Sequence, residues 1–401
     1  MPLPKPYGRT SYATMAEIHI LQLIKGLDIG GVNGGAERFC MDLSRQLSHL
    51  GYKVTICAFF RMHTPAETEA LQTLHSAGLE VIQLAEWRGN GELSSYRQAL
   101  HGLEYYAQSH PVQIVHSHFQ LGTLAALRLK RQRPGLIALR TVHNVQEWEQ
   151  TPSGRLKAHI FTERVFPAWL DAEVGVSQAI LEQLREHPAA TLHPEKIHLI
   201  HNAIDLPKAL PEIKPPKAES GGFIIGSVGR LAEQKGYRFL LAAMPEVLKA
   251  IPSCELHLAG EGEQKAELMS LAEQLGITSQ VKFRGYLGNI PEFLSELDIF
   301  VSSSLWEGLP TTILEAIVAG VPVLATNIAG NRELIQDGLT GWLVQPADAH
   351  ALACGIISAY QHPELRQHFA QEARAILPQF SIQTVSEQYA QLYRQLLAGE
   401  A

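Results

Sequence analysis

Residues 302–326 read SSSLWEGLPTTILEAIVAGVPVLAT, and this stretch predicts the end of a β-strand, a turn, a helix and a second strand in close succession. Pro310 suits the first turn of the helix, where its missing N–H is not needed. Gly320 and Pro322 are typical of a helix end. The turn carries Glu307, and Glu315 lies eight residues later, inside the helix. This strand–helix–strand unit therefore places one carboxylate before a helix start and one inside the helix.

The same alternation of short aliphatic runs with amphipathic stretches extends along almost the whole chain. We predict strands at residues 18–24, 53–59, 80–85, 113–118, 136–143, 173–177 and 197–203, and again at 223–229, 254–260, 281–285, 298–304, 322–327 and 341–344. Strands that alternate with helices indicate a mostly parallel sheet covered on both faces. The predicted fold class is α/β, with two doubly wound, Rossmann-like domains. Ligands of such sheets bind beyond the carboxyl ends of the strands, here in a cleft between the domains.

Proline and glycine mark the boundary between the two domains. The segment 205–222 contains four prolines and two closing glycines, so a semi-rigid linker is predicted at 205–221. It joins a first domain at 16–204 to a second at 222–375, and a helical segment follows at 376–401. Residues 1–15 contain three prolines and no apolar core segment, which predicts a disordered tail rather than a secretory signal. Met15 is an alternative start of translation.

Composition and charge indicate which classes of protein this chain can belong to. Of 401 residues, 46% are hydrophobic and 18% charged, as in soluble globular proteins. The net charge of −7 gives no overall attraction to nucleic acid or to an anionic membrane. The four cysteines form no C-x-x-C pair, which argues against a disulfide framework and suits a reducing cytoplasm. A cytoplasmic protein is therefore predicted.

The helix that follows Pro310 predicts a binding site for a negatively charged group. The free N–H groups of Thr311 and Thr312, together with the helix dipole, favour an anion. Carboxylates accept strong hydrogen bonds from sugar hydroxyls. Glu307 and Glu315 beside such a site therefore indicate a ligand with phosphates in the middle and hydroxylated rings on both sides, which is a nucleotide sugar. The alternative to a ligand site is that Glu307 is only a turn residue and that Glu315 lies on a solvated helix face.

Two loops supply further candidate groups for a diphosphate. VGRLAEQKG, residues 228–236, places Arg230 and Lys235 after the first strand of the second domain. A solvated basic loop is the alternative. DIGGVNGGAER, residues 28–38, carries Gly34 and Gly35, which let the backbone approach a bulky or anionic group. This loop is not G-x-G-x-x-G, so a nicotinamide site is not supported.

Histidines end two strands of the first domain. His143 in TVHN could hydrogen-bond a sugar hydroxyl through a neutral ring. HSH at 116–118 resembles a metal pair, but no Cys or acidic third ligand lies nearby, so we expect no zinc. There is no D-x-D motif, and neither a metal nor another cofactor is predicted.

Together these motifs resemble the retaining glycosyltransferases of the GT-B fold, in particular family 4, over about residues 17–395. In the second domain the resemblance rests on GRLAEQKG, LAGEGE, VKFRGY, SSLWEGLPTTILEAIVAGVPVLAT and GNRELIQDGLTGWLV. In the first domain it rests on the less specific GGAER, HSH, TVHN, GVSQAI and HNAID. The resemblance also implies that the terminal helix, within 376–401, crosses back to the first domain.

The resemblance implies a role for each candidate residue. Glu307 lies near the transferred sugar and Glu315 holds the ribose. Arg230 and Lys235 bind the diphosphate, with Gly34, Gly35, Leu309, Thr311 and Thr312 around the donor, and His143 lies near the C6 hydroxyl of the donor sugar. The resemblance places the base against the backbone around Phe283 to Gly288, with Phe283, Gly285 and Tyr286 as the base-binding residues.

The implied reaction moves a hexose from a nucleotide sugar, with UDP favoured and GDP second, to a hydroxyl of a glycan, a lipid-linked or a small-molecule acceptor. The alternatives are a nucleotide-sugar epimerase or phosphorylase on the same fold, or a non-catalytic binding partner. The sequence does not specify the sugar, the acceptor, the linkage or the oligomeric state.

A contact with anionic membrane is a further hypothesis. RLKRQRPG, residues 128–135, gathers four cations beside an amphipathic helix that could rest on the inner face of the membrane. A solvated helix end is the alternative.

Overall fold

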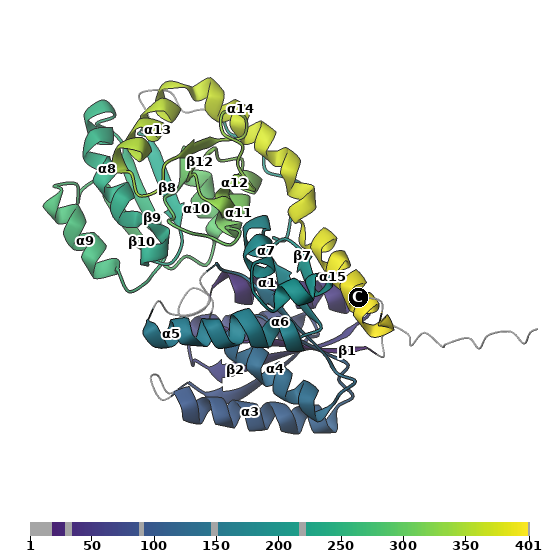
Figure 1. Cartoon of the computed structure of the whole chain (residues 1–401). Helices are drawn as coiled ribbons and strands as arrows, with labels where there is room; N and C mark the ends of the chain where they lie inside the picture. Colours follow the sequence, from purple (N-terminus) through teal and green to yellow (C-terminus); the bar gives the residue numbers. More distant parts are fainter. Residues whose placement is uncertain (1–17, 29–33, 88–91, 146–150, 216–221, 400–401) are drawn as a thin grey trace, which may run out of the picture.

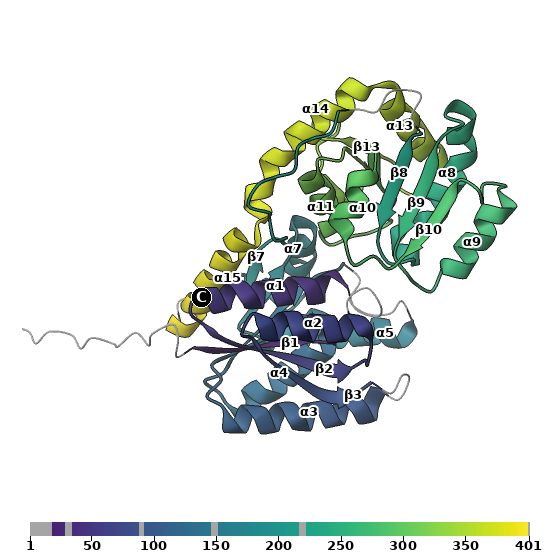
Figure 2. The same ribbon diagram turned by 180° about the vertical axis from the view of Figure 1, so that it is seen from behind.

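The computed structural model describes residues 18–28, 34–87, 92–145, 151–215 and 222–399, and the predicted tail at 1–15 lies outside them. Two parallel sheets organise the chain (Figures 1 and 2). The first has seven strands in the order β3-β2-β1-β4-β5-β6-β7, and the second has six in the order β10-β9-β8-β11-β12-β13. We use "first domain" and "second domain" for the parts built on these two sheets. In each, the order reverses beside the first strand, which creates a crevice at the carboxyl ends of the strands.

Each strand overlaps a predicted range, so the α/β prediction with two parallel sheets is confirmed. The strands are β1 (His19–Ile24), β2 (Lys53–Arg61), β3 (Glu80–Glu86), β4 (Ile114–Ser117), β5 (Ile137–Val142), β6 (Ala172–Gly175), β7 (Ile197–Leu199), β8 (Ile224–Val228), β9 (Glu255–Ala259), β10 (Val281–Gly285), β11 (Ile299–Ser302), β12 (Val323–Thr326) and β13 (Trp342–Val344).

Helices cover both faces of each sheet. In the first domain they are α1 (Gly35–His49), α2 (Pro65–Ser76), α3 (Glu92–Ser109), α4 (Gln120–Gln132), α5 (Pro152–Lys157), the π-helix η2 (Ala158–Val165), α6 (Phe166–Trp169) and α7 (Gln178–Arg185), with short 3-10 turns η3 (Ala190–Leu192) and η4 (Pro194–Lys196). The second domain has η5 (Glu233–Lys235), α8 (Tyr237–Ala250), α9 (Lys265–Gln274), α10 (Ile290–Glu296), α11 (Thr311–Ala319), α12 (Ala329–Arg332), α13 (Ala349–Gln361), α14 (Pro363–Ala373) and η6 (Arg374–Phe380), and α15 (Ile382–Ala398) ends the chain.

Alternate strand residues enter opposite cores, as a sheet buried on both faces requires. In β1, Ile20 packs in the cluster that contains residues of α1, whereas Leu21 packs in the cluster beneath α3 and α4. In β11, Ile299 faces the α8 side and Phe300 faces α11. This two-sided burial explains why the strands read as continuous apolar runs.

The two domains also share apolar packing. Ile180 of α7 belongs to the same buried cluster as Leu309 and Ile313 of the second domain. A Cβ built on Gly308 would lie 2.1 Å from the backbone oxygen of His143, so the two main chains come too close there for any side chain. These contacts bring the carboxyl ends of both sheets together.

Helix α15 leaves the second domain and lies along the first (Figures 1 and 2). It packs against α1, and its side chains Val385, Tyr389 and Tyr393 are fully buried in the first-domain core. The phenol of Tyr393 lies 2.7 Å from Nδ1 of the buried His116. The end of the chain is therefore part of the core of the first domain.

Among the residues that the structure describes, no helix is long and apolar enough to span a membrane.

Candidate active site

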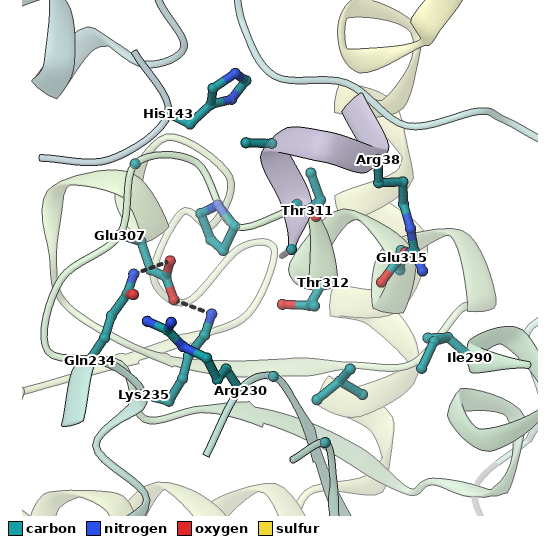
Figure 3. Close-up of a pocket in the computed structure, with 18 of the residues that line it drawn as sticks. Arg38, His143, Arg230, Gln234, Lys235, Ile290, Glu307, Thr311, Thr312 and Glu315 are labelled. Carbon is teal, nitrogen blue, oxygen red and sulfur yellow. Dashed lines mark hydrogen bonds and ion pairs between the residues drawn. The ribbon is translucent and has the colours of Figure 1, made fainter. Parts of the chain in front are cut away.

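A cavity of about 400 Å³ lies between the domains, and most of the predicted site residues line it (Figure 3). They are Gly34, Gly35, His143, Arg230, Lys235, Tyr286, Glu307, Leu309, Thr311, Thr312 and Glu315. Arg38, Asn144 and Gln234, which the sequence did not single out, line it as well. Segments from opposite ends of the chain thus meet at one crevice.

The structure places the three predicted base-binding residues differently. Phe283 lies within β10 and its side chain packs against the core cluster that contains Leu268 of α9, because its position in the strand turns it away from the crevice. Gly285 uses its backbone oxygen to accept a hydrogen bond from the N–H of Gly260, at 2.8 Å. Tyr286 does line the cavity, with Leu287 from the turn that follows β10 and Ile290 from the start of α10. The apolar end of the cavity therefore lies one to five residues beyond the strand.

Two helix starts converge on the cavity. α11 begins at Thr311, and Pro310 is the N-cap residue rather than a residue of the first turn, since its ψ of 103° is extended. The first N–H groups of a helix have no acceptor within that helix. α1 begins at Gly35, where a Cβ would lie 3.9 Å from Oγ1 of Thr311. Both positive helix ends therefore face the same space, which favours an anion.

Glu307 is held by three donors from its own domain. Its Oε1 accepts from Nζ of Lys235 at 2.6 Å and from Oγ of Ser304 at 2.7 Å. Its Oε2 accepts from Nε2 of Gln234 at 3.1 Å (Figure 3). The carboxylate is 8% exposed, so it is both fixed and desolvated. The Lys235 charge is balanced by this partner, whereas Arg230 is exposed at the cavity wall.

Glu315 is paired across the crevice. Nη1 of Arg38, from α1 of the first domain, donates to its Oε1 at 2.7 Å (Figure 3). Burial raises the pKa of Glu315, and the Arg38 charge opposes that rise. Arg38 ends the GGAER motif, but nothing in the sequence pairs it with a residue 277 positions away.

A chain of buried histidines lies behind His143. Nε2 of His118 is 2.9 Å from Oε1 of Gln22, and Nδ1 of His118 is 3.0 Å from Nε2 of His143. A carbonyl oxygen only accepts, so His118 carries its proton on Nε2 and accepts from Nε2–H of His143. Nδ1 of His143 is then an acceptor, and it has no hydrogen-bond partner among the described residues. Burial lowers the pKa of His143 to about 3, so the ring is neutral at pH 7.

The two histidines of the HSH motif form hydrogen bonds with buried groups of the protein. His116 lies 2.8 Å from Oγ1 of Thr141 through Nε2 and contacts Tyr393 through Nδ1, and both ring nitrogens of His118 have the partners given above. In the part of the chain that the structure describes, one group of three metal-ligating side chains lies within 4.8 Å, namely Glu246, His350 and Cys354. None of these three lines the cavity.

Comparison with known proteins identifies the family. Residues 33–208 match the profile of Glycosyltransferase Family 4, and residues 211–376 match that of Glycosyl transferases group 1. EpsD of Bacillus subtilis, a glycosyltransferase by name, is 29% identical over 309 residues, 75% of this chain and 80% of that protein. A glycogen synthase of Mycobacterium tuberculosis is 26% identical over 92% of this chain and 93% of its own.

Solved structures have the same fold. A crystal structure of Anabaena HepE in complex with UDP and glucose has a TM-score of 0.76 at 20% identity, over 94% of this chain and all of that one. A sucrose-phosphate synthase from Thermosynechococcus elongatus has the same TM-score and identity over 95% of this chain and all of that one. The fold is therefore GT-B. The chain belongs to glycosyltransferase family 4 and is a glycosyltransferase that takes its sugar from a nucleotide-sugar donor.

Proposed function

We propose that the protein is a retaining hexosyltransferase that uses a UDP-hexose, with a GDP-hexose as second choice. Its acceptor is a hydroxyl of a glycan, a lipid-linked or a small-molecule substrate. The observation that carries this proposal is the order of groups in one cavity, with two helix starts and Arg230 in the middle and Glu307 and Glu315 on either side. HepE, which shares the fold, was crystallised with UDP-glucose, and this supports UDP.

In this proposal the donor lies along the cavity. The base contacts Tyr286, Leu287 and Ile290, which line the apolar end. The ribose hydroxyls donate to Glu315. The diphosphate faces Arg230 and the N–H groups of Thr311 and Thr312, and Gly35 leaves room for it.

The sugar occupies the end of the cavity between Glu307 and His143. A hydroxyl of the sugar donates to Nδ1 of His143, which the His118 contact leaves as an acceptor. This nitrogen is buried in the structure, so donor binding has to uncover it. A donor in this place would satisfy a buried polar atom that otherwise lacks a partner, and such atoms are costly to leave unpaired. The nitrogen therefore favours a hydroxyl, an N–H or another donor at that position of the sugar.

The bond between the anomeric carbon and the diphosphate breaks toward an oxocarbenium-like state. The negative charge that develops on the leaving group is stabilised by Arg230, Lys235 and the helix N–H groups, and this electrostatic contribution is the largest. The acceptor hydroxyl attacks from the face of the leaving group and transfers its proton to the departing phosphate. A double displacement would need Glu307 as nucleophile. Its oxygens already accept from Lys235, Ser304 and Gln234, which makes it a poor one.

Nucleotide binding tests the donor. A ligand at 100 times its dissociation constant stabilises the folded protein by about 2.7 kcal/mol. We expect UDP to raise the melting temperature more than GDP does at equal concentration. A larger shift with GDP would overturn the choice of base. A shift with neither would contradict the assignment of this cavity to a nucleotide.

Release of free UDP from UDP-sugars then tests the reaction. Transfer or hydrolysis releases UDP, whereas an epimerase converts one UDP-sugar into another and a phosphorylase acts on a sugar phosphate. Binding of UDP-sugars without release, across a panel of acceptors, would favour a non-catalytic partner protein.

A further inference from the structure

A helical stretch on the surface of the first domain exposes large apolar side chains. α5, η2 and α6 follow one another from Pro152 to Trp169 and lie across one side of this domain (Figure 1). On the inner side of the stretch, Phe166 of α6 is fully buried. Leu156, Ile160 and Trp169 point outward, and they are 59%, 42% and 66% exposed. The outer side of this stretch is thus unusually apolar for a surface in contact with water alone.

A neighbouring segment adds a fourth apolar side chain. The N–H of Ala189 donates to the backbone oxygen of Glu163 at 3.2 Å, and Nζ of Lys196 reaches the backbone oxygen of Ala168 at 3.5 Å. These contacts place the turns η3 and η4 beside the helical stretch. Leu192, which ends η3, is 75% exposed. We call Leu156, Ile160, Trp169 and Leu192, with the exposed Arg155 and Arg164, the α5–α6 surface.

The charges of this stretch are of one predominant sign. Residues 152–169 contain the cations Arg155, Lys157 and Arg164 against a single carboxylate, Glu163. That carboxylate lies 2.9 Å from Nδ1 of His159. The chain as a whole has a net charge of −7, so this excess of positive charge is local. It is combined with a tryptophan and aliphatic side chains, the composition of helices that lie in the interface of anionic membranes.

The cationic helix end at residues 128–135 differs from this surface. Arg128 pairs with Glu104 and Lys130 pairs with Asp171, both at 2.5 Å. The apolar residues of α4, such as Ala125 and Leu129, are buried in the core. That helix end therefore offers partly neutralised charge and little apolar area to a membrane.

We propose that the α5–α6 surface docks the protein on an anionic lipid membrane. Trp169 and the aliphatic side chains enter the boundary between headgroups and acyl chains, and Arg155 and Arg164 contact lipid phosphates. In the sequence the stretch begins eight residues after Asn144, which lines the cavity. This inference concerns the surface alone and is independent of the donor proposed above.

Co-sedimentation of the full chain with vesicles tests the proposal. We use vesicles of phosphatidylcholine alone and of phosphatidylcholine with 30 mol% (about one lipid in three) phosphatidylglycerol. The wild type is expected to pellet with the anionic vesicles and to be released by salt. The double variant Leu156→Glu with Trp169→Glu should lose at least about tenfold in partition coefficient. Arg155→Glu with Arg164→Glu should lose binding to anionic vesicles to a similar degree.

Tyr105→Glu is the matched control, because Tyr105 is 75% exposed on α3, away from this surface. It should bind as the wild type does. Circular dichroism and the urea unfolding midpoint show whether each variant is folded. A Trp169→Phe variant keeps the apolar character, and it should bind while losing the tryptophan quenching that brominated lipids cause in the wild type.

Three results would overturn the proposal. The first is a wild type that does not pellet with anionic vesicles. The second is a loss in Tyr105→Glu equal to that in the double variants. The third is unchanged quenching in Trp169→Phe, which would mean that another tryptophan meets the lipid. Concentration-dependent self-association of the wild type that the double variant abolishes, without vesicle binding, would assign the surface to a second copy of the chain instead.

Discussion

Replacement of Arg230 by alanine is the sharpest test of the proposed reaction. The side chain follows β8, is exposed and lines the cavity, so its loss should leave folding almost unchanged, within about 0.5 kcal/mol. Its effect should instead appear when charge develops on the leaving diphosphate. Near wild-type stability combined with a large loss of turnover is the expected signature.

The magnitude follows from the position of the charge. Two unit charges about 4 Å apart interact by about 4 kcal/mol at an effective dielectric constant of about 20. Arg230 is open to solvent before the donor binds, so screening reduces this value, and about 3 kcal/mol is expected. That free energy corresponds to a loss of roughly 150-fold in kcat/KM. Lys235 cannot compensate fully, because Glu307 already holds its ammonium.

The assay is the initial rate of UDP release at several donor concentrations. Arg230→Lys keeps the charge but not the planar fork, so it should fall between the wild type and alanine. Arg238→Ala is the matched control, since Arg238 is exposed in the following helix and does not line the cavity. Turnover of Arg230→Ala within threefold of the wild type would refute the reasoning, as would an equal loss in the control.

Three further predictions concern the surroundings of the site. Glu307→Gln leaves Lys235 without its carboxylate. Because the Lys235 side chain keeps 18% of its surface exposed to water, we expect a loss of about 2–3 kcal/mol in the free energy of unfolding, measured with urea. An unchanged urea midpoint would contradict this pairing. Burial lowers the pKa of His116 and His143 from 6.5 to about 3. Below pH 6.5 these two rings therefore bind protons in the unfolded chain but stay neutral in the folded protein. Stability should therefore decrease as the pH falls from 6.5 toward 3, by about 1.4 kcal/mol per pH unit for each ring, and a flat urea midpoint between pH 6 and 5 would count against it. Gly308→Ala places a Cβ 2.1 Å from the oxygen of His143, so we expect weaker UDP binding and a more open small-angle scattering profile; an unchanged profile would argue that the domains do not need this contact.

The strands could be predicted well from the sequence, because a strand in a sheet that is buried on both faces has an uninterrupted run of apolar residues. The strand that contains Ile20 and Leu21 sends alternate side chains into two cores, and the chain records this as an uninterrupted apolar run. Turns with glycine or proline separate such runs, so each strand could be located to within a few residues. The helix start at Thr311 was displaced by one position only, since a proline is compatible with both the N-cap and the first turn.

Pairings across the crevice could not be predicted in the same way. Arg38 meets Glu315 only because two separately folded sheets face each other, and no local pattern encodes that approach. The direction of the Phe283 side chain could not be predicted, because in a two-sided strand the pattern does not say which face turns toward the cavity. Gln234 lies beside Lys235 in the sequence, yet its bond to Glu307 depends on a turn 73 residues away.

The route of α15 has a consequence for synthesis of the protein on the ribosome. Tyr389 completes the core of the first domain, although it is made 190 residues after β7 ends at Leu199. At about 5–20 residues per second, the first domain remains without α15 for roughly 10–40 s, and the apolar surface that α15 covers on α1 stays exposed. The ribosome therefore makes α15, which completes the core of the first domain, only after it has made the second domain. A chain stalled shortly before Ile382 would expose that apolar surface to chaperones and proteases, even though the segment that is missing belongs to the other end of the sequence.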